Sequence, residues 1–217
     1  MTVRAVDDGS TAQHNHGPTA PHDHGPLPGG VGAGVGVAGS RLHADALRVV
    51  GGYDSPRRQE FLDLLGRSPG TVWREHAGAH LTASALVVSA DGERVLLCLH
   101  GRFHKWVQMG GHCEPGDGSV AAAALREATE ESGIDGLLLS PGPIHLDVHE
   151  VVCSGGPSVH FDVRYAAVAP AGALEAVSAE SEALAWFPHD ALPEPLANGV
   201  EPLVAPARAW LRHTGAA

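Results

Sequence analysis

Residues 110–134 read GGHCEPGDGSVAAAALREATEESGI, a glycine-rich loop followed by an alanine-rich segment with a helical pattern. Ser119 is predicted to cap the start of a helix, because its hydroxyl oxygen can accept a hydrogen bond from an unpaired main-chain N–H. Gly133 is predicted to end that helix, because glycine adopts the left-handed conformation without a steric penalty. The apolar residues at helical spacing, which predict the buried face, are Ala121, Leu125 and Ala128.

Carboxylates gather on another face of the same helix. Glu127, Glu130 and Glu131 have the i, i+3, i+4 spacing that places side chains together, and Glu114 and Asp117 add two acids in the preceding loop. Like charges at this spacing destabilise an isolated helix by about 0.2–0.5 kcal/mol per pair, so any single Glu-Glu pair would ordinarily indicate a solvated helix end. The full set indicates instead an oxygen-rich site for a hard divalent cation, Mg²⁺ or Mn²⁺.

The whole stretch resembles the Nudix box, the signature of the Nudix hydrolases. The residues that match the box are Gly111, Asp117, Arg126-Glu127, Ala128, Glu130-Glu131, Gly133 and Ile134. Two features depart from the pattern: one extra residue separates Asp117 from Arg126, and Asp117 stands where glutamate is more usual. Both departures leave the helical carboxylates intact. The strand pattern around the box extends the resemblance over residues 81–212.

The resemblance implies a Nudix α/β/α sandwich, in which a mixed central β-sheet lies between helices and the box forms a loop–helix–loop motif. It also implies a hydrolase that cleaves the pyrophosphate bond of a nucleoside diphosphate derivative by attack of water on phosphorus. By the same resemblance, Glu127, Glu130, Glu131 and the main-chain carbonyl of Gly110 are the metal ligands. Arg126 would orient these carboxylates.

Further site residues are expected outside the box. The resemblance implies a general base from a loop near Glu182. Arg102 and Lys105 are the basic residues best placed before the box to meet substrate phosphates, with ordinary surface charge as the alternative. Arg164 is a secondary candidate on an alternating strand at residues 158–169, where a polar row facing solvent is the alternative.

Composition limits the partners. The 217-residue chain has a formal net charge of −11, which argues against nucleic-acid binding, since that binding depends on Lys and Arg. The mildly apolar segment 29–39 is too short and glycine-rich for a membrane span. Three cysteines without CxxC spacing indicate reduced thiols. We therefore expect a cytoplasmic protein whose partner is a small molecule.

The N-terminal segment, residues 1–40, is predicted to be disordered, because it offers no large apolar residues at regular spacing to offset the entropy of ordering. It contains two His-x-His units, His14–His16 and His22–His24, of a kind that can chelate zinc, nickel or copper. A flexible tail without a vital role is the alternative.

Residues 41–76 predict a helical lead-in to a Nudix domain at 77–217. Its second helix is expected to start with Pro56 at the first helical position. A DNA-binding helix-turn-helix is disfavoured, because this helix carries too little positive charge. We expect the lead-in to pack either against the catalytic domain or against a second subunit. In the second case the protein would be a homodimer.

The rest of the chain predicts strands and a closing helix. Residues 81–100 predict a β-hairpin with its turn at Asp91-Gly92. Two further strands are expected at 144–153 and 158–169, and a helix at 198–211.

Three other functions are alternatives to hydrolysis. An isomerase of the isopentenyl diphosphate type shares the fold but needs a reactive cysteine in its own local sequence, which none of the three cysteines has. A Nudix-fold ligand sensor would be favoured by loss of the box carboxylates, which are present. A metal-storage role of the tail is compatible with catalysis. The substrate itself is not indicated, and the aromatic candidates for stacking a base are Trp106, Phe103, Phe161 and Tyr165.

Overall fold

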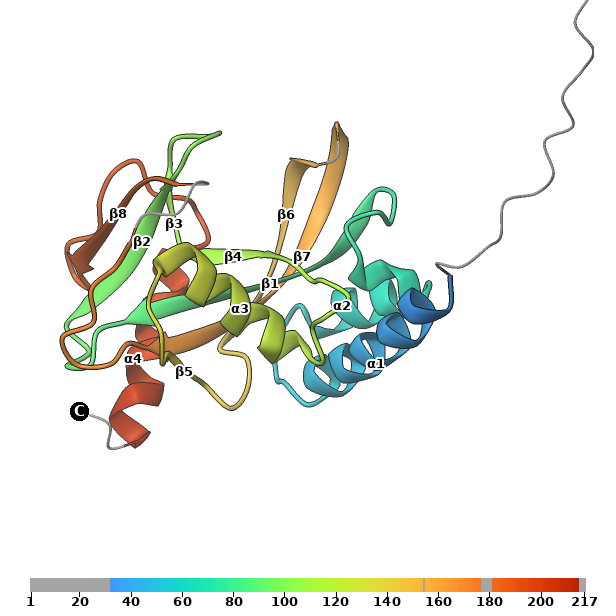
Figure 1. Ribbon diagram of the computed structural model, residues 1–217, viewed down its shortest axis with the longest axis horizontal. Helices are drawn as coiled ribbons and strands as arrows, with labels where there is room; N and C mark the ends of the chain where they lie inside the picture. Colours follow the sequence, from blue (N-terminus) through green and yellow to red (C-terminus); the bar gives the residue numbers. More distant parts are fainter. Residues whose placement is uncertain (1–31, 154, 177–180, 215–217) are drawn as a thin grey trace, which may run out of the picture. The chain divides into compact units, whose positions relative to one another are not determined.

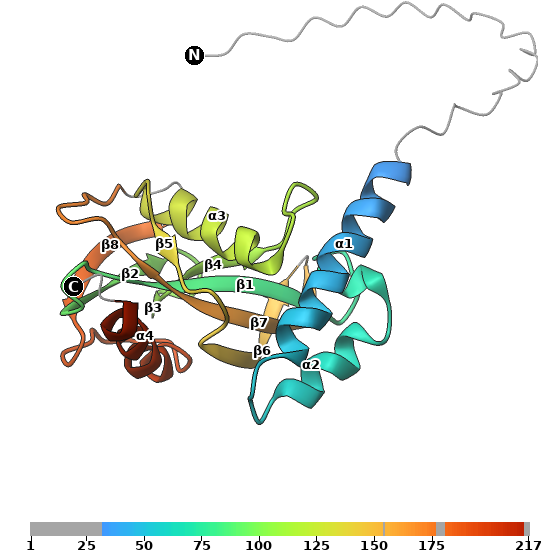
Figure 2. The same cartoon turned by 90° about the horizontal axis from the view of Figure 1, so that it is seen from below.

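The computed structural model describes residues 32–153, 155–176 and 181–214, and these form a mixed sheet of eight strands with helices on both faces (Figures 1 and 2). This confirms the predicted fold class. The sheet path is β3-β2-β1-β7-β5, with β4 paired to β1, β6 to β7 and β8 to β2. The strands are β1 (Ala79–Val88), β2 (Arg94–His100), β3 (Trp106–Val107), β4 (Met109–His112), β5 (Leu138–Leu139), β6 (His145–Cys153), β7 (Gly156–Val168) and β8 (Ser181–Pro188).

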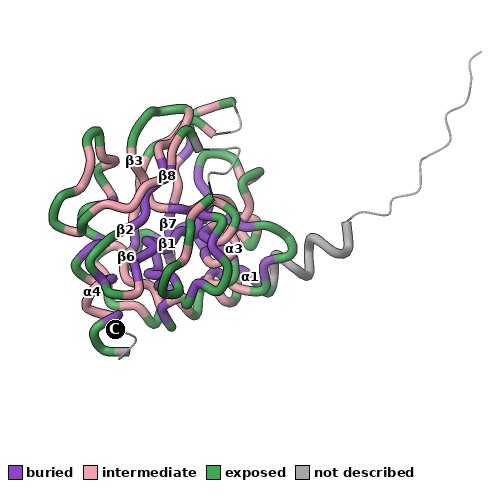
Figure 3. Tube along the Cα trace, turned by 60° about the vertical axis from the view of Figure 1, so that its left-hand side comes forward, coloured by how far each residue is buried: buried purple, intermediate pink, exposed green. Residues whose placement is uncertain are grey.

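Strand β1 is the centre of the sheet. It pairs antiparallel with β2 and β4 and parallel with β7, in a register that places His80 opposite His160 and Ser84 opposite Arg164. All ten of its residues are buried, as the purple tube at the centre of Figure 3 shows. The predicted hairpin is confirmed, with Gly92 at φ +75° in its turn. The two later strands are confirmed as the antiparallel pair β6–β7.

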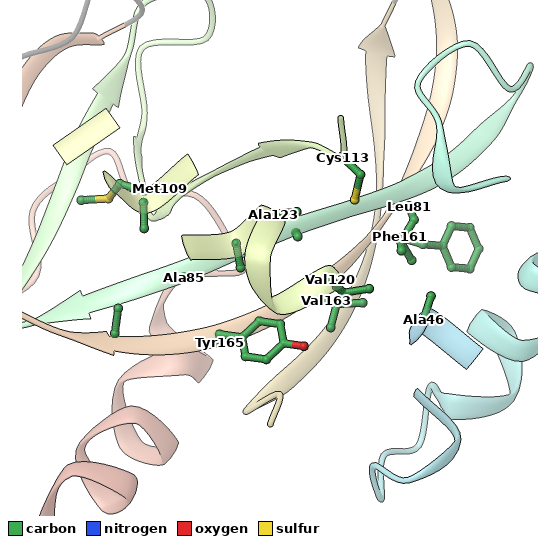
Figure 4. Packing of buried hydrophobic residues seen from close by; sticks show 14 of the residues in the cluster. Ala46, Leu81, Ala85, Met109, Cys113, Val120, Ala123, Phe161, Val163 and Tyr165 are labelled. Atoms are coloured by element: carbon green, nitrogen blue, oxygen red, sulfur yellow. The ribbon is translucent and has the colours of Figure 1, made fainter. Parts of the chain in front are cut away.

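Helix α3 (Val120–Ser132) covers one face of the sheet and α4 (Glu201–Thr214) the other (Figure 2). Figure 4 shows Val120 and Ala123 of α3 among the side chains of β1 and β7. The buried face of α3 is therefore rotated from the predicted one. Its fully covered residues are Val120, Ala123, Ala124 and Ala128, whereas Ala121 and Leu125 are only partly buried. Small alanines at the contact let the helix lie close to the sheet.

Both predicted caps of α3 are confirmed. The Ser119 hydroxyl accepts a hydrogen bond from the Ala122 N–H at 3.0 Å, and Gly133 has φ +66°. A third cap comes from α1 (Gly32–Gly51), since the Asp45 carboxylate accepts a hydrogen bond from the Val120 N–H at 2.8 Å. This negative charge at the helix N-terminus also complements the helix dipole.

The lead-in packs against the sheet domain of its own chain, as one of the two alternatives predicted. It consists of α1, α2 (Arg58–Leu65) and a 3₁₀ turn, η1 (Pro69–Val72). Leu42, Phe61 and Leu65 are buried in the same core as β1 and β7. The Phe61 ring meets the Phe161 ring edge-on, with centroids 5.1 Å apart.

Two boundaries in the lead-in differ from the predictions. Helix α1 begins at Gly32, so residues 32–40, which were expected to be disordered, are helical. Extending a helix that packing has already nucleated costs far less than starting one, which offsets the poor propensity of glycine. Helix α2 begins at Arg58 rather than Pro56, because the Ser55 hydroxyl accepts the Arg57 N–H at 3.2 Å and forms a turn first.

The predicted disorder of residues 1–31 and their His-x-His units lie outside the described residues. Within the described residues, none of the helices has both the length and the apolar character that a membrane span requires.

The hydrogen bond from the Val120 N–H of α3 to Asp45 of α1 tests whether the lead-in stabilises the helix of the box. Asp45→Ala is expected to lower the free energy of unfolding by about 1–2 kcal/mol, because the Val120 N–H loses its acceptor. Asp45→Asn keeps an acceptor oxygen and is expected to lose less. Urea unfolding monitored by circular dichroism measures both variants. Equal losses for alanine and asparagine would contradict the capping role.

Candidate active site

A cleft of ≈ 1930 Å³ runs along α3, β4, the β2–β3 loop and the β6–β7 hairpin. Almost all residues predicted for the site line it: Gly110, Arg126, Glu127, Glu130, Glu131, Arg102, Lys105 and Arg164. Glu182 does not belong to the described residues that line this cleft. The fold thus gathers basic residues from one loop and acids from the box around a shared space.

Arg126 organises the box. Its guanidinium contacts both carboxylate oxygens of Asp117 at 3.1 Å, Glu127 at 3.0 Å and Glu130 at 3.1 Å. It also donates to the main-chain carbonyl of His112 at 2.9 Å. Burial alone would lower the pKa of Arg126, but the bonds to Asp117 and the charge of Glu127 outweigh it and raise that pKa, so the group stays charged. The extra loop residue therefore leaves the Asp117–Arg126 pair intact.

The main chain of β4 lies directly against the box carboxylates. The Gly110 N–H donates to the Glu131 carboxylate at 2.9 Å. A Cβ at Gly110 would lie 2.2 Å from the Cβ of Ser84, and a Cβ at Gly111 would lie 2.6 Å from Oε1 of Glu127. Only glycine permits this approach of the backbone to β1 and to the glutamates.

The donor set fits a hard divalent cation. Residues 110–134 hold five carboxylates and one arginine, so negative charge remains in excess after Arg126 has formed its ion pairs. Glu127, Glu130 and Glu131 all face the cleft, and the Glu130 side chain is 60% exposed. Carboxylate and carbonyl oxygens are the ligands that Mg²⁺ and Mn²⁺ prefer.

The predicted phosphate-binding residues lie at the exposed end of the cleft. Arg102 and Lys105 are both exposed, and Arg102 donates to the main-chain carbonyl of Val152 at 2.8 Å, which joins the β2–β3 loop to the β6–β7 hairpin. Between them, Phe103 is 49% exposed and stacks on His100 with ring centroids 3.8 Å apart. Phe103 is therefore the stacking candidate that lines the cleft.

Arg164 lies in a different environment from the other two cations. It is only 3% exposed, so the alternative of a solvent-facing row is wrong. Its guanidinium contacts Asp162 at 2.8 Å, Asp147 at 2.8 Å and the carbonyl of Gly199 at 2.6 Å. These contacts hold β6, β7 and the segment before α4 together at the cleft wall.

The other candidates are not among the described residues that line the cleft. Glu182 on β8 contacts His104 Nδ1 at 3.1 Å. Phe161 and Tyr165 are buried in the core, and Trp106 packs edge-on against Phe187.

Comparison with known proteins decides the family. The model of the NUDIX domain matches residues 78–207, more than half of the chain. This chain belongs to the Nudix family. It is a Nudix-type pyrophosphohydrolase, which confirms the predicted enzyme class.

Three solved structures illustrate the proteins to which this chain is similar. A NUDIX-family hydrolase from Clostridium perfringens is 24% identical, with a TM-score of 0.46 over 62% of this chain and 97% of that one. An Ap4A hydrolase from C. elegans is 21% identical, with a TM-score of 0.46 over 61% and 98%. A MutT NUDIX hydrolase from Burkholderia pseudomallei is 28% identical, with a TM-score of 0.46 over 58% and 96%. No curated protein matches the Nudix chain.

Sequence reasoning missed much of the cleft wall of this Nudix protein. Asp147, Asp162, His112 and Trp73 all line the cleft and were not proposed. Alternation along the strand at residues 158–169 does place Asp162 on the same face as Arg164. It does not show that this face is buried, because Asp147 and the Gly199 carbonyl, which contact Arg164 there, belong to other segments of the chain.

Two neighbouring glycines of the Nudix box predict different outcomes. Gly110→Ala forces a Cβ into the backbone of β1 and is expected to cost about 1–3 kcal/mol of stability. Gly111→Ala meets the carboxylate end of the Glu127 side chain rather than backbone, so the fold is expected to persist while the displaced carboxylate lowers the hydrolysis rate by about 10²-fold. Urea unfolding and steady-state kinetics separate the two effects. Full activity in Gly111→Ala would contradict the role given to this close approach.

Proposed function

We propose that this Nudix hydrolase cleaves the pyrophosphate bond of a nucleoside diphosphate derivative with Mg²⁺ or Mn²⁺ held by the box. The ligands proposed are Glu127, Glu130, Glu131 and the carbonyl oxygen of Gly110. The observation that carries the proposal is that the three glutamates face the same cleft as the exposed cations Arg102 and Lys105. The proposal includes a cytoplasmic location and a small-molecule partner, and it leaves a homodimer to be tested by gel filtration.

The chain's own residues prepare the site before substrate binds. Arg126 fixes Glu127 and Glu130, and the Gly110 N–H fixes Glu131, so the carboxylates need little reorganisation during the reaction. When bound, the metal supplies Lewis-acid stabilisation of charge on the phosphate oxygens and lowers the pKa of a coordinated water.

The substrate must approach a protein of net charge −11, so local cations are needed to bind its phosphates. Arg102 and Lys105 provide these in the β2–β3 loop, where guanidinium and ammonium groups form charge-assisted hydrogen bonds with phosphate. Phe103 lies between them in sequence and stacks on His100, which offers a flat surface for a base. Arg164 contributes by positioning the cleft wall, since its guanidinium is already bonded to Asp147 and Asp162.

Glu182 remains the proposed general base. It lies on β8 and pairs with His104, the neighbour in sequence of Phe103 and Lys105. A Glu182→Gln variant is expected to lower kcat by about 10²–10⁴-fold, because glutamine cannot accept the proton from water. An unchanged kcat would exclude Glu182 as the base.

A panel of nucleoside diphosphate derivatives tests the proposed function. It includes ADP-ribose and Ap4A, each assayed with Mg²⁺, with Mn²⁺ and with EDTA, and ³¹P NMR identifies the products. We expect hydrolysis of at least one member with incorporation of solvent ¹⁸O into one phosphate product, and none in EDTA. Equal rates in EDTA, or no cleavage of any member, would contradict the proposal.

A further inference from the structure

Four side chains capable of binding a transition metal converge at the cleft wall, and none of them is a box glutamate. They are His80 of β1, His112 of β4, Cys153 of β6 and His160 of β7, and one ligand atom from each lies within 4.8 Å of the others. The parallel register of β1 and β7 places His80 directly opposite His160. Nitrogen and sulfur donors suit softer ions than the oxygen donors of the box.

Two distances within this cluster are close to those of a tetrahedral zinc site. Nε2 of His112 lies 3.2 Å from Nε2 of His80 and 3.4 Å from Sγ of Cys153. Nitrogens about 2.05 Å and sulfur about 2.3 Å from a tetrahedral zinc ion would lie about 3.3 Å (N–N) and about 3.6 Å (N–S) apart. The three groups are thus already spaced as ligands of one ion.

One histidine of the cluster has a ring nitrogen that a metal would satisfy. Nε2 of His160 is buried and has no hydrogen-bond partner within the described part of the chain. A buried polar atom without a partner is costly, and a metal bond would satisfy it.

We propose that His80, His112, His160 and Cys153 form a tetrahedral zinc site in the wall of the cleft. Four protein ligands complete the coordination of zinc, which is typical of structural sites rather than catalytic ones. Binding releases one proton to solvent from the Cys153 thiol, while the neutral imidazoles donate lone pairs. Ser158 Oγ lies 3.5 Å from Nδ1 of His80 and is placed to orient that ring from behind.

The consequence is a link between the hairpin and the box. Cys153 is the last residue of β6, and His112 is the last residue of β4, whose carbonyl accepts a hydrogen bond from Arg126. Zinc would tie both strand ends to the central strand β1. The site uses none of the box glutamates, so it can exist whether or not the proposed hydrolysis is correct.

Zinc retention by the full chain tests the site. The histidines of the tail are first replaced (His14→Asn, His16→Asn, His22→Asn, His24→Asn) to remove the His-x-His units, and excess Mg²⁺ is present throughout. Zinc is then titrated in competition with a chromophoric chelator, and Co²⁺ serves as a spectroscopic probe. We expect a single tightly bound equivalent, a thiolate-to-cobalt charge-transfer band, and a higher Tm with zinc.

Two ligand variants and two matched controls decide the outcome. Cys153→Ser and His160→Asn are each expected to weaken zinc binding by more than about 100-fold. Loss of an outer-shell partner costs up to about 100-fold, and loss of a direct ligand should cost more. Cys153→Ser is also expected to abolish the thiolate-to-cobalt charge-transfer band. Cys98→Ser, in β2, should keep the single bound equivalent of zinc. So should His149→Asn, which changes the residue on β6 that lies opposite His160 of β7. Absence of zinc from the parent, or binding unaffected by both ligand variants, would overturn the proposal. Circular dichroism identifies any variant that fails to fold, and Cys153→Asp, which restores an anionic ligand, then replaces Cys153→Ser.

Discussion

Glu131→Gln is expected to lower kcat/KM for pyrophosphate hydrolysis in Mg²⁺ by about 10³-fold. The variant removes a charged ligand, and metal stabilisation of the transition state is worth several kcal/mol, with about 1.4 kcal/mol for each factor of ten. The amide oxygen can still accept the hydrogen bond from the Gly110 N–H, so the fold is expected to persist. Steady-state kinetics and urea unfolding on the same samples separate activity from stability.

Two further glutamates make this test specific. Glu130→Gln is expected to act in the same direction, because Glu130 is also a proposed metal ligand and faces the cleft. Glu114→Gln is the control, because Glu114 is not a proposed metal ligand. Its side chain is 64% exposed and comes no closer than 4.0 Å to Arg126, so this ion pair is weak. We therefore expect the activity of Glu114→Gln to stay within about threefold of the parent. Near-normal hydrolysis by Glu131→Gln would refute the metal-ligand assignment.

Arg126→Ala is expected to produce the largest loss of stability, about 3–5 kcal/mol in the free energy of unfolding. The reason is that the Asp117 side chain is only 5% exposed and would lose its bidentate cation. Arg126→Lys keeps the charge but cannot reproduce the paired contacts, so it should recover only part of the loss.

A double-mutant cycle isolates the pair. Asp117→Asn removes the buried charge, so the combined variant Arg126→Ala, Asp117→Asn should be destabilised by less than the sum of the two single variants. Urea unfolding curves give the four free energies. Strict additivity would show that Arg126 does not stabilise the loop through Asp117.

Local patterns predicted those features of the fold that depend on neighbours in sequence. Ser119 and Gly133 cap α3 because capping is decided within a few residues, and the β1–β2 hairpin follows from a turn at Asp91-Gly92. The enzyme class came from the resemblance of residues 110–134 to a known box. Composition alone would have given only an acidic α/β protein.

Features that depend on strand register could not be predicted in this way. Alternation indicated that Arg164 shares a face with its second neighbours, but its burial comes with contacts to Asp147 of β6 and to the Gly199 carbonyl, 17 and 35 residues away in sequence. The His80–His160 pairing comes from the register of β1 and β7, which are about 80 residues apart. The start of α1 at Gly32 depends on tertiary packing that outweighs the poor helix propensity of glycine.

The most direct test of the central claim is a Mn²⁺ titration followed by electron paramagnetic resonance. Mn²⁺ prefers oxygen ligands, so the histidine–cysteine cluster competes weakly for it, and Cys153→Ser serves as the control. The parent is expected to bind Mn²⁺ in the box, and the triple variant Glu127→Gln, Glu130→Gln, Glu131→Gln to lose that binding while keeping its circular dichroism spectrum. A folded triple variant that bound Mn²⁺ as tightly as the parent would contradict the account.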